Sequence, residues 1–200
     1  LLTAIMMVLY FAPPIKLAYG VNINSDTTIT ADTSNQQTFN ASDLTLTISN
    51  GATITKSGNQ AIKTGTNSTI VIKSGATVNA TGNQAIGSQA KDTTIINNSG
   101  TIDADGNFAI KISNTTNAII TNNKGGVITA ATNTIYGQLS SGLTITNSGT
   151  ISVESLSSYA IDLANGTGST ITLKDGSLII GKISTTGTGN KLQFDHGFGR

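Results

Sequence analysis

The stretch Asn-Ser-Gly-Thr-Ile occupies residues 98–102 and occurs again at residues 147–151. Looser versions, each a polar turn with glycine followed by a short apolar strand, start at Ser49, Lys73, Asn123 and Lys174. Successive versions are about 24 residues apart, and a constant spacing in this range is the signature of a repeat architecture. The sequence therefore predicts a stack of similar units.

Two further segments recur in each repeat. One follows the glycine turn by about eight residues and occupies 58–62, 82–86, 106–110 and, more loosely, 157–161. The other precedes the turn and occupies 44–48, 69–72, 93–96, 118–121, 143–145 and 170–173. Each repeat therefore contains three short strands and three turns, and this predicts about six coils.

The strands alternate between apolar and polar residues, as Leu44, Leu46 and Ile48 do with Thr45 and Thr47 between them. This period of two indicates one buried face in each strand. A single short strand cannot bury that face alone, but coils stacked at about 4.8 Å form continuous aliphatic columns inside and a backbone ladder along the axis. The sequence predicts an all-β, three-sided parallel β-solenoid, roughly 30 Å long for six coils.

The alignment of the repeats predicts which side chains stack. One interior column would contain Ile54, Val78, Ile102, Ile128, Ile151 and Leu178, and a second would contain Ile62, Ile86, Ile110 and Ile161. Small residues next to a turn would be Ala61, Ala85, Ala109 and Ala160. Stacked amides form hydrogen-bonded ladders, and we expect one from Asn59, Asn83 and Asn107.

The chain divides into four segments. Residues 1–20 are interpreted as a signal peptide without its basic n-region: residues 1–12 are apolar, Pro13 and Pro14 follow, and the small residues Ala18 and Gly20 suit a cleavage site. A truncated membrane anchor or a buried strand are the alternatives. We expect an N-terminal cap at 21–42, the coils at 43–183, and the start of a further coil at 184–200, including a strand at 191–194, in a chain that continues beyond Arg200.

Composition narrows the functional classes. The chain has 11 basic and 10 acidic residues, a net charge of +1, and only 10% charged residues. No electrostatic footprint for nucleic acid is visible. Cysteine is absent, so disulfides and thiolate metal sites are excluded. The abundance of Thr, Ile, Asn, Gly and Ser favours strands and tight turns.

The chain resembles the passenger region of bacterial autotransporters. The resemblance is carried by the signal peptide, the two Asn-Ser-Gly-Thr-Ile stretches, and the segments Ile-Gly-Lys-Ile at 180–183 and Gly-Asn-Lys-Leu at 189–192. The resemblance implies a right-handed parallel β-helix, consistent with the general handedness of parallel crossovers. It also implies export to the cell surface, outer membrane or extracellular space by an outer-membrane β-barrel translocator in the same chain, expected outside these 200 residues.

The function implied is that of a structural, adhesin-type stalk, not an enzyme, whose partners are host-cell or surface glycans or proteins. Two alternatives stay open. One is a fragment of a carbohydrate-active β-helix enzyme, and the other is a filamentous adhesin secreted by a two-partner system.

Residues suited to chemistry are few. Asp103 and Asp105 would share one strand face, where an acid pair can serve catalysis or Ca²⁺, but the adjacent coils place no further charge beside them. Lys63, Lys111 and Asp162 would form one outward column interrupted by Gly87 and Tyr136, which we interpret as a solubilising surface.

His196 is the single histidine and has no nucleophile or metal ligand at a suggestive spacing. The pairs Thr45/Thr47 and Thr144/Thr146 suggest an ice-binding array, but Val71, Lys73 and Ile95 interrupt it. The sequence therefore predicts no catalytic residue, no cofactor and no metal site.

Overall fold

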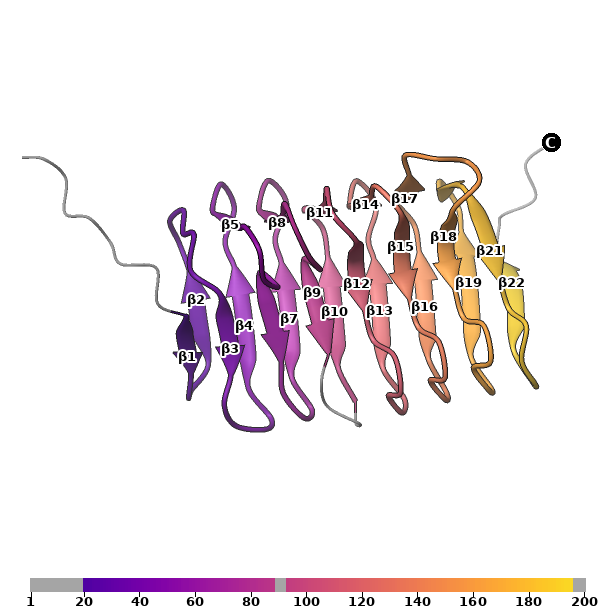
Figure 1. Cartoon of the computed structure of the whole chain (residues 1–200), viewed down its shortest axis with the longest axis horizontal. Helices are drawn as coiled ribbons and strands as arrows, with labels where there is room; N and C mark the ends of the chain where they lie inside the picture. Colours follow the sequence, from indigo (N-terminus) through magenta and orange to yellow (C-terminus); the bar gives the residue numbers. More distant parts are fainter. Residues whose placement is uncertain (1–19, 89–92, 196–200) are drawn as a thin grey trace, which may run out of the picture.

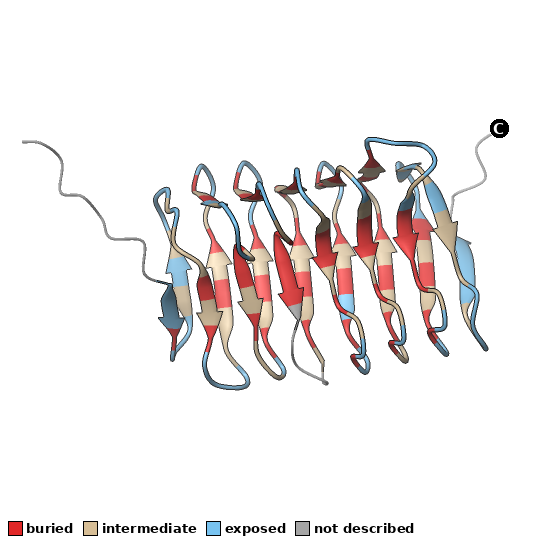
Figure 2. Ribbon diagram, viewed as in Figure 1, coloured by how far each residue is buried: buried red, intermediate tan, exposed pale blue. Residues whose placement is uncertain are grey.

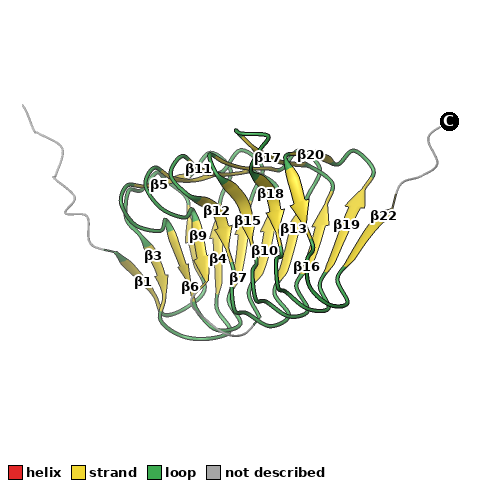
Figure 3. Ribbon diagram, turned by 45° about the vertical axis from the view of Figure 1, so that its right-hand side comes forward, coloured by secondary structure: helices red, strands yellow, loops and turns green. Residues whose placement is uncertain are grey.

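The computed structural model describes residues 20–88 and 93–195. These residues form a rod of parallel strands that begins at β1 and ends at β22 (Figure 1). None of them is helical (Figure 3). None forms a helix long and apolar enough to cross a membrane. Residues 1–19 of the expected signal peptide, and His196, lie outside the described residues.

Three parallel sheets run along the rod, and successive coils add one strand to each. The first sheet contains β1 (Val21–Ile23), β3 (Gln37–Phe39), β6 (Ile62–Thr64), β9 (Ile86–Ser88), β12 (Phe108–Lys111), β15 (Asn133–Tyr136), β18 (Tyr159–Asp162) and β21 (Lys182–Ser184). The second contains β2 (Thr27–Ile29), β4 (Thr45–Ile48), β7 (Thr69–Ile72), β10 (Ile95–Asn98), β13 (Ile119–Asn122), β16 (Thr144–Asn147), β19 (Thr170–Lys174) and β22 (Lys191–Asp195). The third contains β5 (Thr53–Lys56), β8 (Thr77–Ala80), β11 (Thr101–Ala104), β14 (Val127–Ala130), β17 (Thr150–Val153) and β20 (Leu178–Ile180).

Six complete coils result, from β3–β5 to β18–β20, and the predicted three-sided β-solenoid is confirmed. Strand register shows the expected repeat directly: Ile54 pairs with Val78, and Val78 pairs with Ile102, a separation of 24 residues each time. The expected strand at 191–194 is present as β22.

Aliphatic side chains fill the interior, and the alternating burial of the strands is visible along the rod (Figure 2). The column through Ile62, Ile86, Ile110 and Ile161 is confirmed, and Ile135 belongs to it as well. The predicted alanines Ala61, Ala85, Ala109 and Ala160 are fully buried. Burial of methyl and methylene groups supplies the main stabilising free energy of such a core.

The first predicted column needs one correction. Ile151 pairs with Ile179, whereas Leu178 pairs with Thr150 and faces outward with 49% exposure. Lys174 to Ile179 matches Lys73 to Val78 position by position, so the sequence alignment was one residue out of register. A shift of one residue in a strand exchanges its inner and outer faces.

The amide ladder lies in a different place from the one predicted. Asn98 Nδ2 donates to Asn122 Oδ1 at 2.9 Å, and Asn122 Nδ2 donates to Asn147 Oδ1 at 2.8 Å. All three side chains are fully buried at the ends of β10, β13 and β16. Asn59 is exposed on a turn, and the Oδ1 of Asn83 accepts a hydrogen bond from the backbone of Gln84 instead. The prediction for Asn59, Asn83 and Asn107 was therefore wrong.

The two ends of the rod differ. At the N-terminal end, the coil that contains β1 and β2 contributes no strand to the third sheet, which begins at β5. Residues near Thr33 lie along the edge of β5 instead, and Asp32 Oδ1 accepts a hydrogen bond from the Thr53 amide at 2.9 Å. At the other end, all five residues of β22 are exposed. Leu192 and Phe194 continue the inward positions of Ile171 and Leu173 in register, yet they are 42% and 66% exposed.

Candidate functional site

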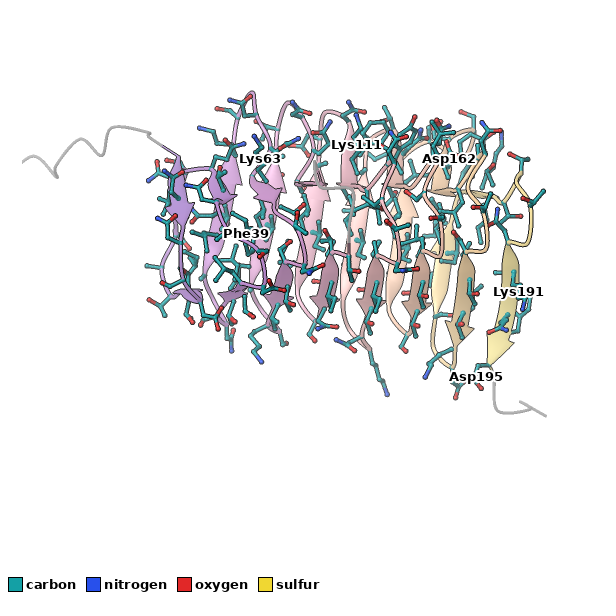
Figure 4. All side chains as sticks on the ribbon, turned by 90° about the horizontal axis from the view of Figure 1, so that it is seen from below. Phe39, Lys63, Lys111, Asp162, Lys191 and Asp195 are labelled. Atoms are coloured by element: carbon teal, nitrogen blue, oxygen red, sulfur yellow. The ribbon has the colours of Figure 1, made fainter. Side chains whose placement is uncertain are left out.

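Among the described residues, the outer side of the first sheet carries lysines and aromatic residues that the outer sides of the other two sheets do not combine in this way. One column of outward residues runs along β6, β9, β12, β15, β18 and β21, and strand register places in it Lys63, Gly87, Lys111, Tyr136, Asp162 and Ser184. The predicted column of Lys63, Lys111 and Asp162, with Gly87 and Tyr136 between them, is confirmed. Its three charged residues lie along one side of the rod (Figure 4).

A second row lies beside this column. Phe108 pairs with Asn133, the Tyr159 amide donates to Asn133 Oδ1 at 3.2 Å, and Tyr159 pairs with Lys182. We call these two rows together the first-sheet face, defined by Lys63, Gly87, Lys111, Tyr136, Asp162, Ser184, Phe108, Asn133, Tyr159 and Lys182.

Aromatic rings and lysines contact one another on this face. The centroids of the Phe108 and Tyr136 rings are 4.4 Å apart with an interplanar angle of 32°. The Lys111 ammonium lies 5.8 Å from the Phe108 centroid and 5.9 Å from the Tyr136 centroid. Lys182 lies 5.9 Å from the Tyr159 centroid. These are cation–π distances, which hold the ammonium groups near the rings.

A polar chain continues from the rings to a buried carboxylate. The Tyr136 hydroxyl is hydrogen-bonded to Gln138 Oε1, and Gln138 Nε2 donates to Asp162 Oδ2 at 3.1 Å. Asp162 is only 4% exposed, and its Oδ1 accepts from the Ala164 amide at 3.1 Å. Within the described part of the chain, Asp162 has no ion-pair partner, so hydrogen bonds alone compensate the desolvation of its charge.

A polar hollow of about 280 Å³ adjoins the N-terminal end of the face. Its lining consists of Gln36, Asn59, Gln60, Lys63 and Asn83. Gln36 Nε2 donates to the Gln60 carbonyl at 2.9 Å. The Gln60 side chain extends over Gly87, where an added Cβ would lie 2.5 Å from Gln60 Nε2. Glycine thus makes room for an amide at this position.

The acid pair of the third sheet lies on a different side of the rod. Asp103 pairs with Asn79 and Thr129, as expected, whereas Asp105 lies just beyond the end of β11. Burial raises the pKa of Asp103, and the nearby Asp105 and Glu154 carboxylates raise it further, while a hydrogen bond from the Ala104 amide opposes the increase. No group of three or more metal-ligating residues occurs among the described residues.

The threonine array is interrupted in the structure. Thr45 pairs with Thr69, but Ile95 and Ile119 follow before Thr144. The neighbouring column has Val71 and Asn97 between Thr47 and Thr121. Strand register therefore agrees with the sequence argument against a regular ice-binding surface.

The sequence predicted Tyr136 in the Lys63 column, but the column was interpreted as a solubilising surface, and the rings of Phe108 and Tyr159 beside it were overlooked. Phe108, Tyr136 and Tyr159 lie in three consecutive coils of one sheet. Aromatic residues make up only 4% of the chain. Their recurrence at one strand of successive repeats was the signal that would have identified this face.

Comparison with known proteins bears on the whole rod. Neither the curated proteins nor the solved structures contained a match to the chain. A family model described as the third pectate lyase-like domain of BigA matches residues 16–172. The match covers more than three quarters of the chain and includes the strands from β1 to β18. On this match, the chain is a member of the BigA third pectate lyase-like domain family.

Proposed function

We propose that this chain is part of the passenger of an exported, autotransporter-like protein and serves as a rigid, adhesin-type stalk at the bacterial cell surface. The observation that carries the proposal is the stack of six complete coils with an interior filled mainly by aliphatic side chains. Such a rod holds the side chains of its outer faces at a fixed spacing along its whole length.

The outer faces support a binding role. The second sheet presents mainly threonine, as at Thr144, Thr146 and Thr172, and these side chains are partly exposed. Many weak contacts repeated along a rigid rod combine into strong attachment through multivalency. Membership of the BigA third pectate lyase-like domain family agrees with a β-helical scaffold.

Surface display is testable on intact cells that express the natural gene. An epitope tag inserted between Leu156 and Ser157, in an exposed turn, is expected to bind antibody without permeabilisation. The tagged cells are also expected to adhere to a surface more strongly than cells lacking the gene. Antibody binding only after permeabilisation would overturn the proposal.

Two alternative functions give different outcomes. The Asp103–Asp105 pair, with its raised Asp103 pKa, is the observation that favours a carbohydrate-active enzyme. Release of unsaturated or reducing sugar by the purified chain, abolished in Asp103→Asn, would establish that function. A two-partner-secreted adhesin predicts that display depends on a translocator encoded by a separate gene, whereas the proposed route uses a barrel in the same chain.

A further inference from the structure

We propose that the first-sheet face binds a glycan chain carrying anionic groups, with the chain lying along the rod axis. This inference rests on the proposed adhesin function, because it names the face and the class of ligand through which adhesion occurs. Three independent features of the structure converge on this face: its aromatic rings, its uncompensated lysines, and the amide-lined hollow at its end.

Most of the described aromatic residues lie on the outer side of the first sheet, where the packing of the aliphatic core does not require them. Phe39, Phe108, Tyr136, Tyr159 and Phe194 are the aromatic residues within the described ranges, and three of them belong to the first-sheet face. Phe108 and Tyr136 are partly exposed, and Tyr159 is 36% exposed. Aromatic rings offer an apolar surface for the C–H groups of a pyranose, and the Tyr136 and Tyr159 hydroxyls add hydrogen-bonding groups.

The charge of the face is positive. Lys63, Lys111 and Lys182 stand against one carboxylate, Asp162, which leaves +2. Asp162 is buried, and its two oxygens accept hydrogen bonds from Gln138 and Ala164. The lysines are therefore available to an anionic ligand, and cation–π contacts already orient two of them.

The opposite charge lies on another side of the rod. Asp103 belongs to the third sheet, and the nearby carboxylates of Asp105 and Glu154, in the turns that follow β11 and β17, contribute to its raised pKa. A polyanion approaching the rod is repelled there and attracted to the first sheet. The strands of the first sheet carry Lys63, Lys111, Lys182 and Asp162, whereas those of the third sheet carry only Lys56 and Asp103. Positive charge is therefore in excess on the first sheet, even though the net charge of the whole chain is only +1.

The hollow supplies groups that suit hydroxyls. Four of its five lining residues are amides, and each amide offers both donors and an acceptor, with the Lys63 ammonium beside them. Gln84, the residue after Asn83, is 6% exposed, and its Oε1 is buried without a hydrogen-bond partner. Gln84 is not part of the lining itself, but this oxygen has hydrogen-bonding capacity that the protein leaves unused.

The dimensions of the rod suit a polymer. Successive coils lie about 4.8 Å apart, which is close to the length of one sugar residue in an extended chain. A glycan aligned with the axis therefore meets a new coil at each residue, from the hollow at β6 to Lys182 on β21. Each contact is weak, and the repeated contacts add through effective concentration.

The test uses the full chain and four immobilised probes: heparin, hyaluronan, dextran and poly-L-glutamate. We expect binding to at least one of the two anionic glycans, weakening as salt increases, with little binding to dextran or poly-L-glutamate. The double variant Lys63→Glu/Lys111→Glu is expected to weaken glycan binding about tenfold or more. Tyr159→Ala, which leaves the charge unchanged, is expected to weaken it as well.

A charge-matched control separates this face from net charge. Lys73→Glu/Lys124→Glu alters two exposed lysines at the turns between the second and third sheets and is expected to bind within about twofold of the parent chain. Unfolding curves of all variants establish that they fold, and Lys63→Gln/Lys111→Gln replaces the first pair if the glutamates prevent folding.

Absence of binding to both anionic glycans would overturn the inference. So would equal weakening by the two lysine pairs, equal binding to poly-L-glutamate, or equal binding to dextran. Surface labelling of the tagged natural protein is measured separately. A displayed protein that binds none of these glycans therefore refutes the ligand assignment alone, whereas a protein that is not displayed refutes the stalk function.

Discussion

At the scale of single residues, Asn122 is a fully buried side chain that forms hydrogen bonds with both neighbouring coils. Its Nδ2 group donates to Asn147 Oδ1 and also lies within hydrogen-bonding distance of the carbonyls of Gly126 and Thr150. Its Oδ1 accepts from Asn98. The side chain is fully buried, so water cannot replace any of these partners. The ladder ends at Ile72 on one side and Leu173 on the other.

Replacing Asn122 by alanine is therefore expected to lower the free energy of unfolding by about 3 kcal/mol, because buried polar groups on both neighbouring coils lose their partners. Asn97→Ala, on the partly exposed outer side of β10, is the matched control and is expected to change the free energy by less than about 0.5 kcal/mol. Urea unfolding followed by circular dichroism measures both. Equal effects of the two substitutions would contradict the structural role of the ladder.

Asp103 makes stability depend on pH in an unusual direction. Its pKa in the folded chain is raised above the ordinary value of 3.8, so the folded state binds the proton more tightly than the unfolded state does. Stability is then highest below pH 3.8 with respect to this group and falls as pH rises through the folded pKa. Asp103→Asn removes this loss of stability.

We therefore expect Asp103→Asn to be more stable than the parent chain at pH 7. The difference should shrink as pH falls toward 3 and both forms carry an uncharged side chain. Urea midpoints across this range provide the measurement. Asp43→Asn, at an exposed position, serves as the control for loss of a surface carboxylate, and a pH-independent effect of Asp103→Asn would refute the explanation.

At the scale of elements, the turn between the second and third sheets occurs in two lengths. Ile70 and Val78 are eight residues apart across the longer form, and Ile96 and Ile102 are six apart across the shorter form. In the shorter form, Asn98 Oδ1 accepts from the Gly100 amide at 3.2 Å, so the buried asparagine also closes the turn. The Asn-Ser-Gly-Thr-Ile stretches are the two copies of this shorter turn.

Gly100 is required by the closeness of the preceding coil. A Cβ at this position would lie 2.3 Å from the Ala76 carbonyl oxygen and 2.6 Å from that of Lys73. Gly100→Ala is therefore expected to lower the free energy of unfolding by more than about 2 kcal/mol, because backbone of two coils has to move. Thermal and urea unfolding of the variant provide the measurement.

Gly125 provides the comparison within the longer turn. Its φ is +82°, and no atom lies within 4 Å of an added Cβ. Gly125→Ala is expected to cost about 1 kcal/mol from backbone strain alone. If it destabilises the chain as much as Gly100→Ala does, contact between coils is not what the shorter turn requires.

At the scale of the whole molecule, each coil contacts mainly its two neighbours. Thr77 pairs with Thr101, so removal of residues 77–100 is expected to bring β11 directly onto β5 in unchanged register. The shortened chain should fold, retain a β-type circular dichroism spectrum, and form a rod shorter by about 4.8 Å. Small-angle scattering measures the length.

Removal of only residues 77–88 is the control for this deletion. It removes β8 and β9 but leaves β10. The turn that normally leads from the second sheet to the third would then be followed by another strand of the second sheet. We expect this chain to aggregate or remain unfolded. Equal folding of both deletions would mean that the coil is not the structural unit of the molecule.

Much of this architecture is readable from the sequence alone. The 24-residue spacing and the alternation in each strand determined the number of coils, the three sheets and most interior columns, because a parallel stack places equivalent residues above one another. The column of Lys63, Lys111 and Asp162 followed from the same spacing.

Other features depended on the tertiary structure. Leu178 and the asparagine ladder were misplaced because a repeat alignment gives the period, whereas the face of a residue depends on where a turn ends and the next strand begins. Asn98 lies two positions after the buried Ile96 and is thereby inside, while Asn59 lies on a turn and is outside. The contacts among Phe108, Lys111 and Tyr136 join neighbouring coils and rows through side-chain geometry, which only the folded stack brings together.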